Sequence, residues 1–301
     1  SFEEGLGLQS GFQKSDDDYL LLLEHDPIYT LGSSTKPEHL KEIENFGVDI
    51  AEVDRGGSVT FHGPGQIVGY PIVSVEQTSG DVRGSLKFIQ QLQLVLIEAL
   101  QILGIEAIAK AGFTGVWADR GEQYSEVNRY QKIAAIGVKV AHGRTRHGFA
   151  LNVSTDLGYF EKIVPCGIED YGVTSLHELG FDHISFSEIE ETITKTFVER
   201  FGYSSIDIAS TWSVIGDELV LSNDIVRKSE HSRSESSTIS LGRPDFPSNS
   251  GDLSRFSSEA VSVAQPSLRL LGRLSKAGVA VDSTKDRTSR PDWMKNKFRA
   301  T

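Results

Sequence analysis

The chain has 301 residues, 38% of them hydrophobic, and a formal net charge of −12. This length holds one large domain or two small ones, and the acidic charge disfavours nucleic acid as a partner, since phosphate contacts need clustered Lys and Arg. One cysteine excludes an intramolecular disulfide and a cysteine-rich metal site, and no apolar run reaches the roughly 20 residues of a membrane span, so we expect neither a metal nor a membrane partner.

Strand-like and helix-like patterns alternate over the first 210 residues. Two helices are predicted, one with apolar steps from Leu86 to Leu103 and a stop at Gly104, the other with Ser187 and Glu190 as a capping box. The apolar stripe of the second is Ile189, Ile193, Phe197 and Phe201, ending at Gly202. Short apolar runs predict strands at Tyr19–Leu23, Ile28–Leu31, Gly69–Val75, Val116–Ala118, Ile133–Val140 and Phe149–Val153. This order indicates a mixed α/β (α+β) domain.

The composition changes near residue 222. Residues 1–210 carry 16 Lys and Arg against 31 Asp and Glu, whereas residues 211–301 carry 14 against 11. Serine fills 11 of the 31 positions from 229 to 259, which is typical of a solvated linker. We therefore expect a catalytic domain over 1–221 and a largely disordered tail over 222–301, although Leu268–Leu274 regains some apolar character. Because the chain begins at Ser1 without a Met, we expect a fragment or mature form, and the N-terminus gives no localisation.

Four segments place glycine beside reactive or polar residues: Arg55–Gln66, Lys132–Gly137, His147–Asn152 and Ile163–Gly167. The glycines of the first let backbone approach a ligand and expose N–H donors. The segment lacks the Gly-Lys-Ser/Thr of a P-loop, and it runs into a strand rather than opening a helix as a dinucleotide site does. It is interpreted either as a binding loop or as a tight turn with a buried Arg55.

Cys166 lies between Pro165 and Gly167, a pattern that presents a side chain on a turn. The alternative is a buried cysteine that acts as a small hydrophobic residue. Lys132 enters an apolar strand, or else lies at its exposed end. If the two side chains meet, the ammonium would lower the thiol pKa and the lysine would carry protons to and from the reacting groups. The segments around Gly137 and Gly167 would supply N–H donors to a tetrahedral oxyanion.

Together these segments resemble the lipoyl(octanoyl) transferase family. The resemblance rests on matching stretches in the family's order over about residues 15–205: Glu24–Gly32, Arg55–Pro71, Gly115–Ala118, Lys132–Val140, His147–Val153 and Val164–Gly167. It implies a fold similar to the catalytic domains of biotin and lipoate ligases. It also implies transfer of octanoate from octanoyl-acyl carrier protein to a lysine of lipoyl domains, in 2-oxoacid dehydrogenases and the glycine cleavage H protein.

The resemblance further assigns roles to residues. Cys166 would carry the acyl thioester, and Lys132 would lower its pKa and shuttle protons. The substrate pocket would be lined by Arg55, Gly56, Gly57, Ser58, Val59, Thr60, Phe61, His62, Ala135, Ile136, Gly137, Gly148, Phe149 and Ala150. No cofactor is expected, because a thioester is already activated and needs no ATP. We expect a monomer, in the mitochondrion or plastid of a eukaryote or the cytoplasm of a bacterium.

Some features depart from the family pattern. Phe61 replaces a common tyrosine, and residues 120–130 are expected to form a surface insertion. Lys139, Arg144 and Arg146 are the expected positive patch for acidic partners, unless they form an ordinary solvated hairpin. Arg290–Lys295 is similar to the segment preceding the radical domain of lipoyl synthases, which suggests a longer fusion. Two other functions stay open: an ATP-dependent lipoate or biotin ligase, and an inactive scaffold that binds lipoyl domains.

Overall fold

The computed structural model describes residues 1–41, 43, 47–76, 84–168, 170–208, 211–215, 218–222, 236–240 and 268–276. Most of the predicted tail, including Arg290–Lys295, lies outside these residues. Within the described part of the chain, no helix is long and apolar enough to cross a membrane.

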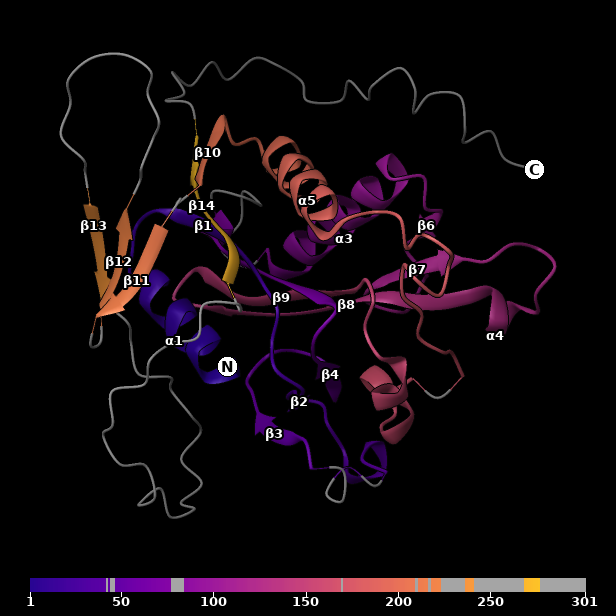
Figure 1. The fold of residues 1–301 in the computed structure, drawn as a ribbon. Coiled ribbons are helices and arrows are strands. Elements are labelled where there is room, and N and C mark those ends of the chain that lie inside the picture. The colour runs from indigo at the N-terminus through magenta and orange to yellow at the C-terminus, as the bar shows by residue number, and fades with distance from the viewer. Residues whose placement is uncertain are drawn as a thin grey trace.

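An eight-stranded antiparallel sheet forms the centre of the fold, in the order β10-β14-β1-β5-β9-β8-β7-β6 (Figure 1). Its strands are β1 (Asp18–Leu23), β5 (Gln66–Ile72), β6 (Ala107–Ile108), β7 (Val116–Asp119), β8 (Tyr130–Ala141), β9 (Arg144–Asn152), β10 (Ser205–Ile208) and β14 (Leu268–Ser275). The predicted strands in this region are confirmed, with differences in their bounds. β5 begins and ends three residues before the predicted Gly69–Val75, and β9 begins five residues before the predicted Phe149–Val153. A turn at His142 and Gly143, both with positive φ, joins the long hairpin of β8 and β9.

Two helices cover one face of this sheet, α3 (Ser85–Ile102) and α5 (Phe186–Phe201), and they pack on each other (Figure 1). The predicted α5 stripe is buried, and Gly202 ends the helix in the left-handed region. Two details of the prediction were wrong. Ser185, not Ser187, caps α5 by accepting a hydrogen bond from Glu188 N at 3.2 Å. Leu86 is 75% exposed, because Phe88 takes the first core position of α3.

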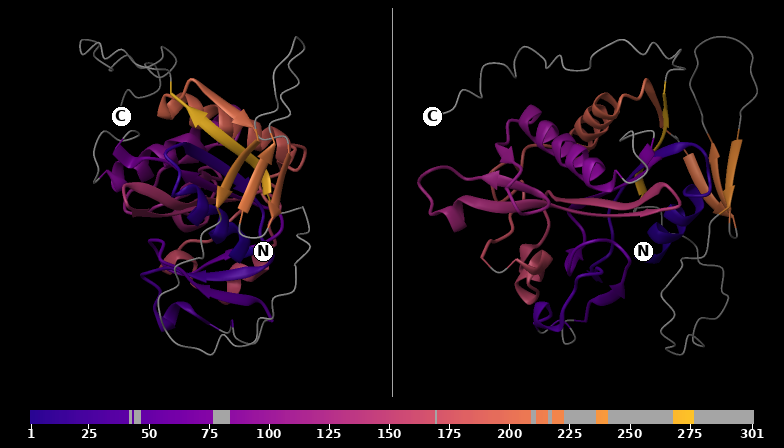
Figure 2. Two further views of the ribbon diagram at one scale, coloured as in Figure 1. Left: turned by 90° about the vertical axis from the view of Figure 1, so that its left-hand side faces the viewer. Right: turned by 180° about the vertical axis from the view of Figure 1, so that it is seen from behind.

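The opposite face carries the smaller elements that complete the site. A three-stranded sheet there has the order β3-β2-β4, with β2 at Ile28–Leu31, β3 at Asp49–Glu52 and β4 at Thr60–His62. Short helices flank it: η1 (Pro37–His39), η3 (Leu157–Lys162) and η4 (Pro165–Gly167). α1 (Phe2–Phe12) lies beside a further sheet of β11 (Thr211–Ile215), β12 (Glu218–Ser222) and β13 (Ser236–Ser240) (Figure 2). α4 (Glu126–Arg129) lies in the predicted insertion, whose residues 122–128 are exposed.

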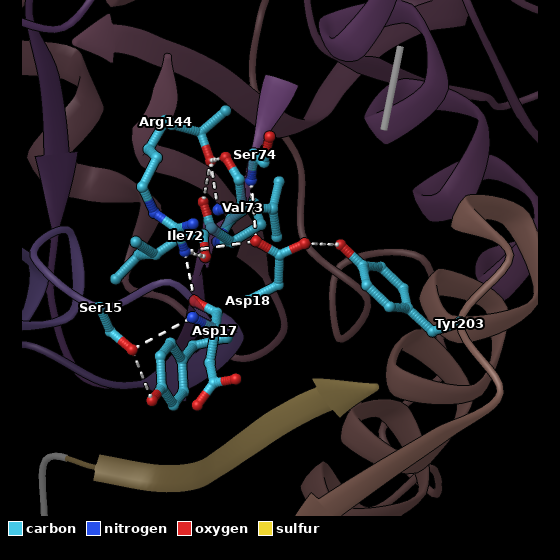
Figure 3. A network of polar contacts seen from close by, with 11 residues as sticks. Ser15, Asp17, Asp18, Ile72, Val73, Ser74, Arg144 and Tyr203 are labelled. Carbon is cyan, nitrogen blue, oxygen red and sulfur yellow. Dashed lines mark hydrogen bonds and ion pairs between the residues drawn. The ribbon is translucent and has the colours of Figure 1, made fainter. Parts of the chain in front are cut away.

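A buried polar cluster ties the ends of several strands together near β14 (Figure 3). The Asp18 carboxylate, on a residue 5% exposed, accepts hydrogen bonds from Tyr203 Oη and Ser74 N at 2.8 Å each. Arg144 Nη2 lies 3.3 Å from Asp18 Oδ1. A buried carboxylate is stable when it is paired and hydrogen-bonded, so this cluster joins β1, β9 and the segment after α5.

The sequence from 222 to 301 was predicted as tail, yet it supplies β14. This strand pairs with β1 from Asp18↔Leu274 to Leu23↔Leu268 and with β10 from Ser205↔Ser275 to Ile208↔Gly272. The mixed charged and apolar sequence of this segment did not reveal the pairing, because strand partners that lie far apart in the sequence are not visible in composition.

A chain ending at residue 222 is expected to be less stable than one ending at residue 276. Its β1 edge would be open and the burial of Leu274, 5% exposed, would be lost. A loss of about 2 kcal/mol corresponds to a fall in Tm of about 4–8 °C for a domain of this size. Equal Tm values for the two chains in thermal unfolding would contradict the role of β14.

Candidate active site

A cavity of about 380 Å³ lies between the central sheet and the β3-β2-β4 sheet. Its volume is within the roughly 300–1,000 Å³ of small-molecule sites. All of the predicted site residues border it except Val59 and Phe61: Arg55, Gly56, Gly57, Ser58, Thr60, His62, Lys132, Ala135, Ile136, Gly137, Gly148, Phe149, Ala150 and Cys166. The structure thus brings segments more than a hundred residues apart in the sequence to one cavity.

Val59 and Phe61 were expected in the pocket, and the structure corrects this. Side chains alternate along an extended strand, so Thr60 and His62 face the cavity while their neighbours face away. Val59 is 0% exposed and Phe61 1%, in a separate apolar cluster. The Phe61 ring stacks on Tyr159, with 4.3 Å between centroids, which gives the ring a packing role that needs no hydroxyl.

Cys166 is presented on η4, as the Pro–Gly pattern predicted. Its φ is 56° and its ψ 17°, in the left-handed region that residues other than glycine rarely adopt. Its N–H donates to Val59 O at 2.9 Å, and the next N–H, of Gly167, donates to Val164 O at 2.9 Å. The side chain borders the cavity from a partly exposed turn. Since strained backbone collects at functional sites, this geometry favours a reactive thiol over a core residue.

The strain at Cys166 can be measured by substitution. The free energy of unfolding of Cys166→Gly, measured by urea denaturation, is expected to be about 1 kcal/mol higher than that of Cys166→Ala. The reason is that glycine adopts positive φ without a Cβ clash. The comparison of two variants that both lack the thiol separates backbone strain from chemistry. A Gly variant no more stable than the Ala variant would show that the turn is unstrained.

Lys132 lies on β8 and is 5% exposed, so the interpretation as a surface lysine was wrong. Its backbone is held on one side by residues 172–174, with Lys132 N donating to Gly172 O at 3.0 Å and Thr174 N to Lys132 O at 2.9 Å. Its Nζ lies 5.0 Å from the centroid of the Trp117 ring. Among the described residues the Lys132 Nζ has no hydrogen-bond or ion-pair partner. Lys132 and Cys166 border the main cavity and also a smaller one of about 10 Å³.

Arg55 is a second buried cation at the cavity, 8% exposed. Its Nη2 donates to Thr30 O at 2.7 Å and Thr30 Oγ1 at 2.8 Å, and its Nη1 donates to Ser58 O at 2.8 Å. No carboxylate in the described part of the chain pairs with it, and Nε has no partner. Burial lowers the Arg55 pKa, and the Cys166 thiol acts in the opposite direction. An unpaired buried cation attracts negative charge, so this position is suited to a thiolate or an oxyanion.

Several residues that line the cavity were not predicted. His147, at φ 57°, lies 2.9 Å through Nε2 from Asp54 Oδ1. Burial lowers the His147 pKa, while the His147 and Arg146 contacts hold the Asp54 pKa below its usual range. Tyr70 reaches the cavity from β5, and its Oη lies 2.7 Å from His25 Nε2. His147 begins one of the four glycine-containing segments and Tyr70 lies in the family-matching stretch Arg55–Pro71, so a signal existed for both. No signal pointed to Phe113.

The expected positive patch does not form as predicted. Arg144 pairs with Asp18, and Arg146 pairs with Asp54 at 2.5 Å, which leaves the two side chains 12% and 13% exposed. Lys139 alone is exposed. Two of the three side chains are therefore occupied by carboxylates of the same chain, which leaves little free positive charge on the hairpin for an acidic partner. No group of His, Cys, Asp or Glu in the described residues is arranged to hold a metal ion.

The covered antiparallel sheet and the cavity with its thiol and two cations lie within a known class of catalytic domain. Residues 2–198 match the family model of the lipoyl protein ligase A/B catalytic domain, more than half of the chain. The chain is 45% identical over 186 residues to the octanoyltransferase of Koribacter versatilis, covering 60% of this chain and 70% of that one. For the octanoyltransferase of Christiangramia forsetii the identity is 42% over 188 residues, with 61% and 77% covered. The chain belongs to the octanoyltransferase family and is an acyltransferase.

Solved structures agree on the fold. A putative lipoate protein ligase from T. acidophilum with bound lipoic acid superposes with a TM-score of 0.53 at 17% identity, covering 66% of this chain and 80% of that one. Lipoate-protein ligase A bound with ATP gives a TM-score of 0.52 at 16% identity, with 66% and 81% covered. The predicted lipoate ligase-like, mixed α/β fold is confirmed.

Proposed function

We propose that this enzyme transfers an octanoyl group from octanoyl-acyl carrier protein to a lysine of lipoyl domains, through a thioester on Cys166. The observation that carries the proposal is the placement of Cys166 and Lys132 at one cavity with apolar walls. Val68, Ile136 and Phe149 supply the apolar surface that an eight-carbon chain needs. The Phe149 ring lies across Gly69, where a Cβ would be 2.1 Å from Cζ. A residue larger than glycine there would move the ring.

In the first step the Cys166 thiolate attacks the carbonyl carbon of the donor thioester. The new Sγ–C bond forms, the tetrahedral oxyanion collapses, and the C–S bond of the donor breaks. Lys132 gives its proton to the departing thiolate, which leaves as the carrier protein's thiol. The Cys166 and Gly167 N–H groups are already bonded to carbonyl oxygens, so the predicted oxyanion donor at Gly167 is occupied. The positive charges of Arg55 and Lys132 take that role.

In the second step the ε-amine of the acceptor lysine attacks the octanoyl carbonyl carbon on Cys166. The C–N bond forms, Lys132 accepts the proton that the nitrogen loses, and the C–S bond breaks to return the Cys166 thiolate. The octanoyl amide leaves with its lipoyl domain. Acceptors of this kind are the lipoyl domains of 2-oxoacid dehydrogenases and the glycine cleavage H protein. No ATP is consumed, because the acyl group arrives and stays at the thioester level until the amide forms.

An ATP-dependent ligase is the competing function, since one structural neighbour is a lipoate-protein ligase bound with ATP. A lipoyl domain incubated with octanoyl-acyl carrier protein and no ATP is expected to gain an octanoyl group. Free octanoate with ATP is expected to give none. Modification only in the second mixture would establish a ligase, and modification in neither would indicate the inactive scaffold.

A further inference from the structure

The protonation of the His62 ring is set by its neighbour Gln66. His62 lies on β4, is 7% exposed and borders the cavity. Its Nδ1 lies 2.8 Å from Gln66 Oε1. In a neutral imidazole one nitrogen carries the proton and the other accepts hydrogen bonds. Which nitrogen does so therefore depends on which end of the Gln66 amide faces the ring.

The Gln66 amide is oriented by two acceptors. Its Nε2 donates to Phe61 O at 3.1 Å and to Asn152 Oδ1 at 2.9 Å. Oε1 is thus the atom turned toward His62, and an amide oxygen can only accept. His62 must donate through Nδ1–H, which leaves Nε2 without a proton.

Asn152 fixes Gln66 in the same way, and its own orientation is set by the backbone. Asn152 Nδ2 donates to Thr174 O at 3.0 Å, so Oδ1 faces Gln66. Thr174 N in turn donates to Lys132 O at 2.9 Å. Gln66 is 1% exposed, Asn152 4% and Thr174 2%. This buried relay connects the His62 ring to the strand that carries Lys132. Rotating either side-chain amide by 180° would place two donors or two acceptors against each other.

His62 Nε2 has no hydrogen-bond partner among the residues that the structure describes. Burial lowers the His62 pKa to about 3, so the ring is neutral near pH 7. A neutral ring nitrogen with a lone pair attracts an N–H group and repels an oxyanion. Of the groups that react in the proposed mechanism, the attacking amine offers N–H donors. The octanoyl oxygen offers none.

We propose that Gln66 and Asn152 are positioning residues that present the His62 Nε2 lone pair to the N–H of the attacking lysine amine. This rests on the proposed function and names the step in which the relay acts. The hydrogen bond orients the amine lone pair toward the octanoyl carbon on Cys166. His62 takes no proton, because Lys132 accepts it.

The tautomer is tested by ¹⁵N NMR of the imidazole groups, with the His62 signals assigned by their loss in His62→Gln. The native enzyme is expected to show a protonated Nδ1 and an unprotonated Nε2 at neutral pH. Gln66→Leu removes the acceptor beside Nδ1 and is expected to lose this pattern. A native enzyme with the proton on Nε2 would overturn the inference without any variant.

The reaction step is tested by measuring the two half-reactions separately in Gln66→Leu. Octanoylation of Cys166 by octanoyl-acyl carrier protein is expected at the native rate. Transfer from the isolated octanoyl-enzyme to a lipoyl domain is expected to slow about 10- to 100-fold, since the amine is no longer oriented.

Thr155→Val is the matched control. Thr155 is 4% exposed and donates to Gly65 O at 3.0 Å, beside the relay but outside it. It is expected to change neither half-reaction. Equal slowing of both half-reactions in Gln66→Leu, or of neither, would overturn the proposal. If native Cys166 gains no octanoyl group, both the proposed function and the proposed amine step are wrong. The NMR spectrum tests the His62 tautomer independently of that result.

Discussion

Replacing Cys166 with Ser is expected to reduce octanoyl transfer by roughly 10³-fold or more, the effect of losing a nucleophile. A hydroxyl does not ionise near neutral pH as a thiol does, so the cations at the cavity have no anion to hold. Transfer from octanoyl-acyl carrier protein to a lipoyl domain, followed by mass spectrometry of the acceptor, measures the loss.

The fold provides the control for this substitution. The backbone N–H of Cys166 donates a hydrogen bond to Val59 O, and this bond does not depend on the side chain. The Ser variant should therefore unfold at the native temperature. A folded Ser or Ala variant that transfers octanoate at the native rate would rule out the thioester mechanism.

Replacing Lys132 with Met is expected to reduce transfer by about 10²- to 10⁴-fold, the usual range for a lost general acid or base. Met keeps an unbranched apolar side chain at this buried position and removes the charge that lies over the Trp117 ring. The thiolate fraction of Cys166 should fall with it, because a nearby ammonium favours the charged sulfur. Alkylation by iodoacetamide at neutral pH should be slower than in the native enzyme.

Lys132→Arg separates charge from proton transfer. A guanidinium keeps the positive charge and is expected to restore alkylation, but it does not give up a proton in the working pH range. Transfer should stay low in this variant. If the pH profile of alkylation is the same in native and Lys132→Met enzymes, then Lys132 does not act on the thiol.

Much of the fold could be predicted because its elements are periodic. The stripe of α5 and the apolar strand around Ile133 are visible as local patterns, and both are buried as expected. β14 could not be predicted, because its stability comes from pairing with β1 and β10 rather than from its own pattern. The apolar character of Leu268–Leu274 was visible in the sequence, but it did not show which strands this segment pairs with.

The site shows the same division. Cys166 stood out because Pro165 and Gly167 fix a turn, and the turn is there. Val59 and Phe61 were placed in the pocket because a motif was treated as a continuous lining, whereas strand alternation turns every second side chain away. Arg146 was expected on the surface, but its partner Asp54 lies on another segment and cannot be inferred from spacing. Contacts between segments were the part that sequence could not supply.

The thioester on Cys166 is tested most directly by intact-protein mass spectrometry after incubation with octanoyl-acyl carrier protein, without ATP and without a lipoyl domain. The enzyme is expected to gain one octanoyl group, located on the peptide containing Cys166 and released by neutral hydroxylamine. Adding a lipoyl domain should then return the enzyme to its unmodified mass. An enzyme that modifies the lipoyl domain but never carries octanoate on Cys166 would contradict the mechanism.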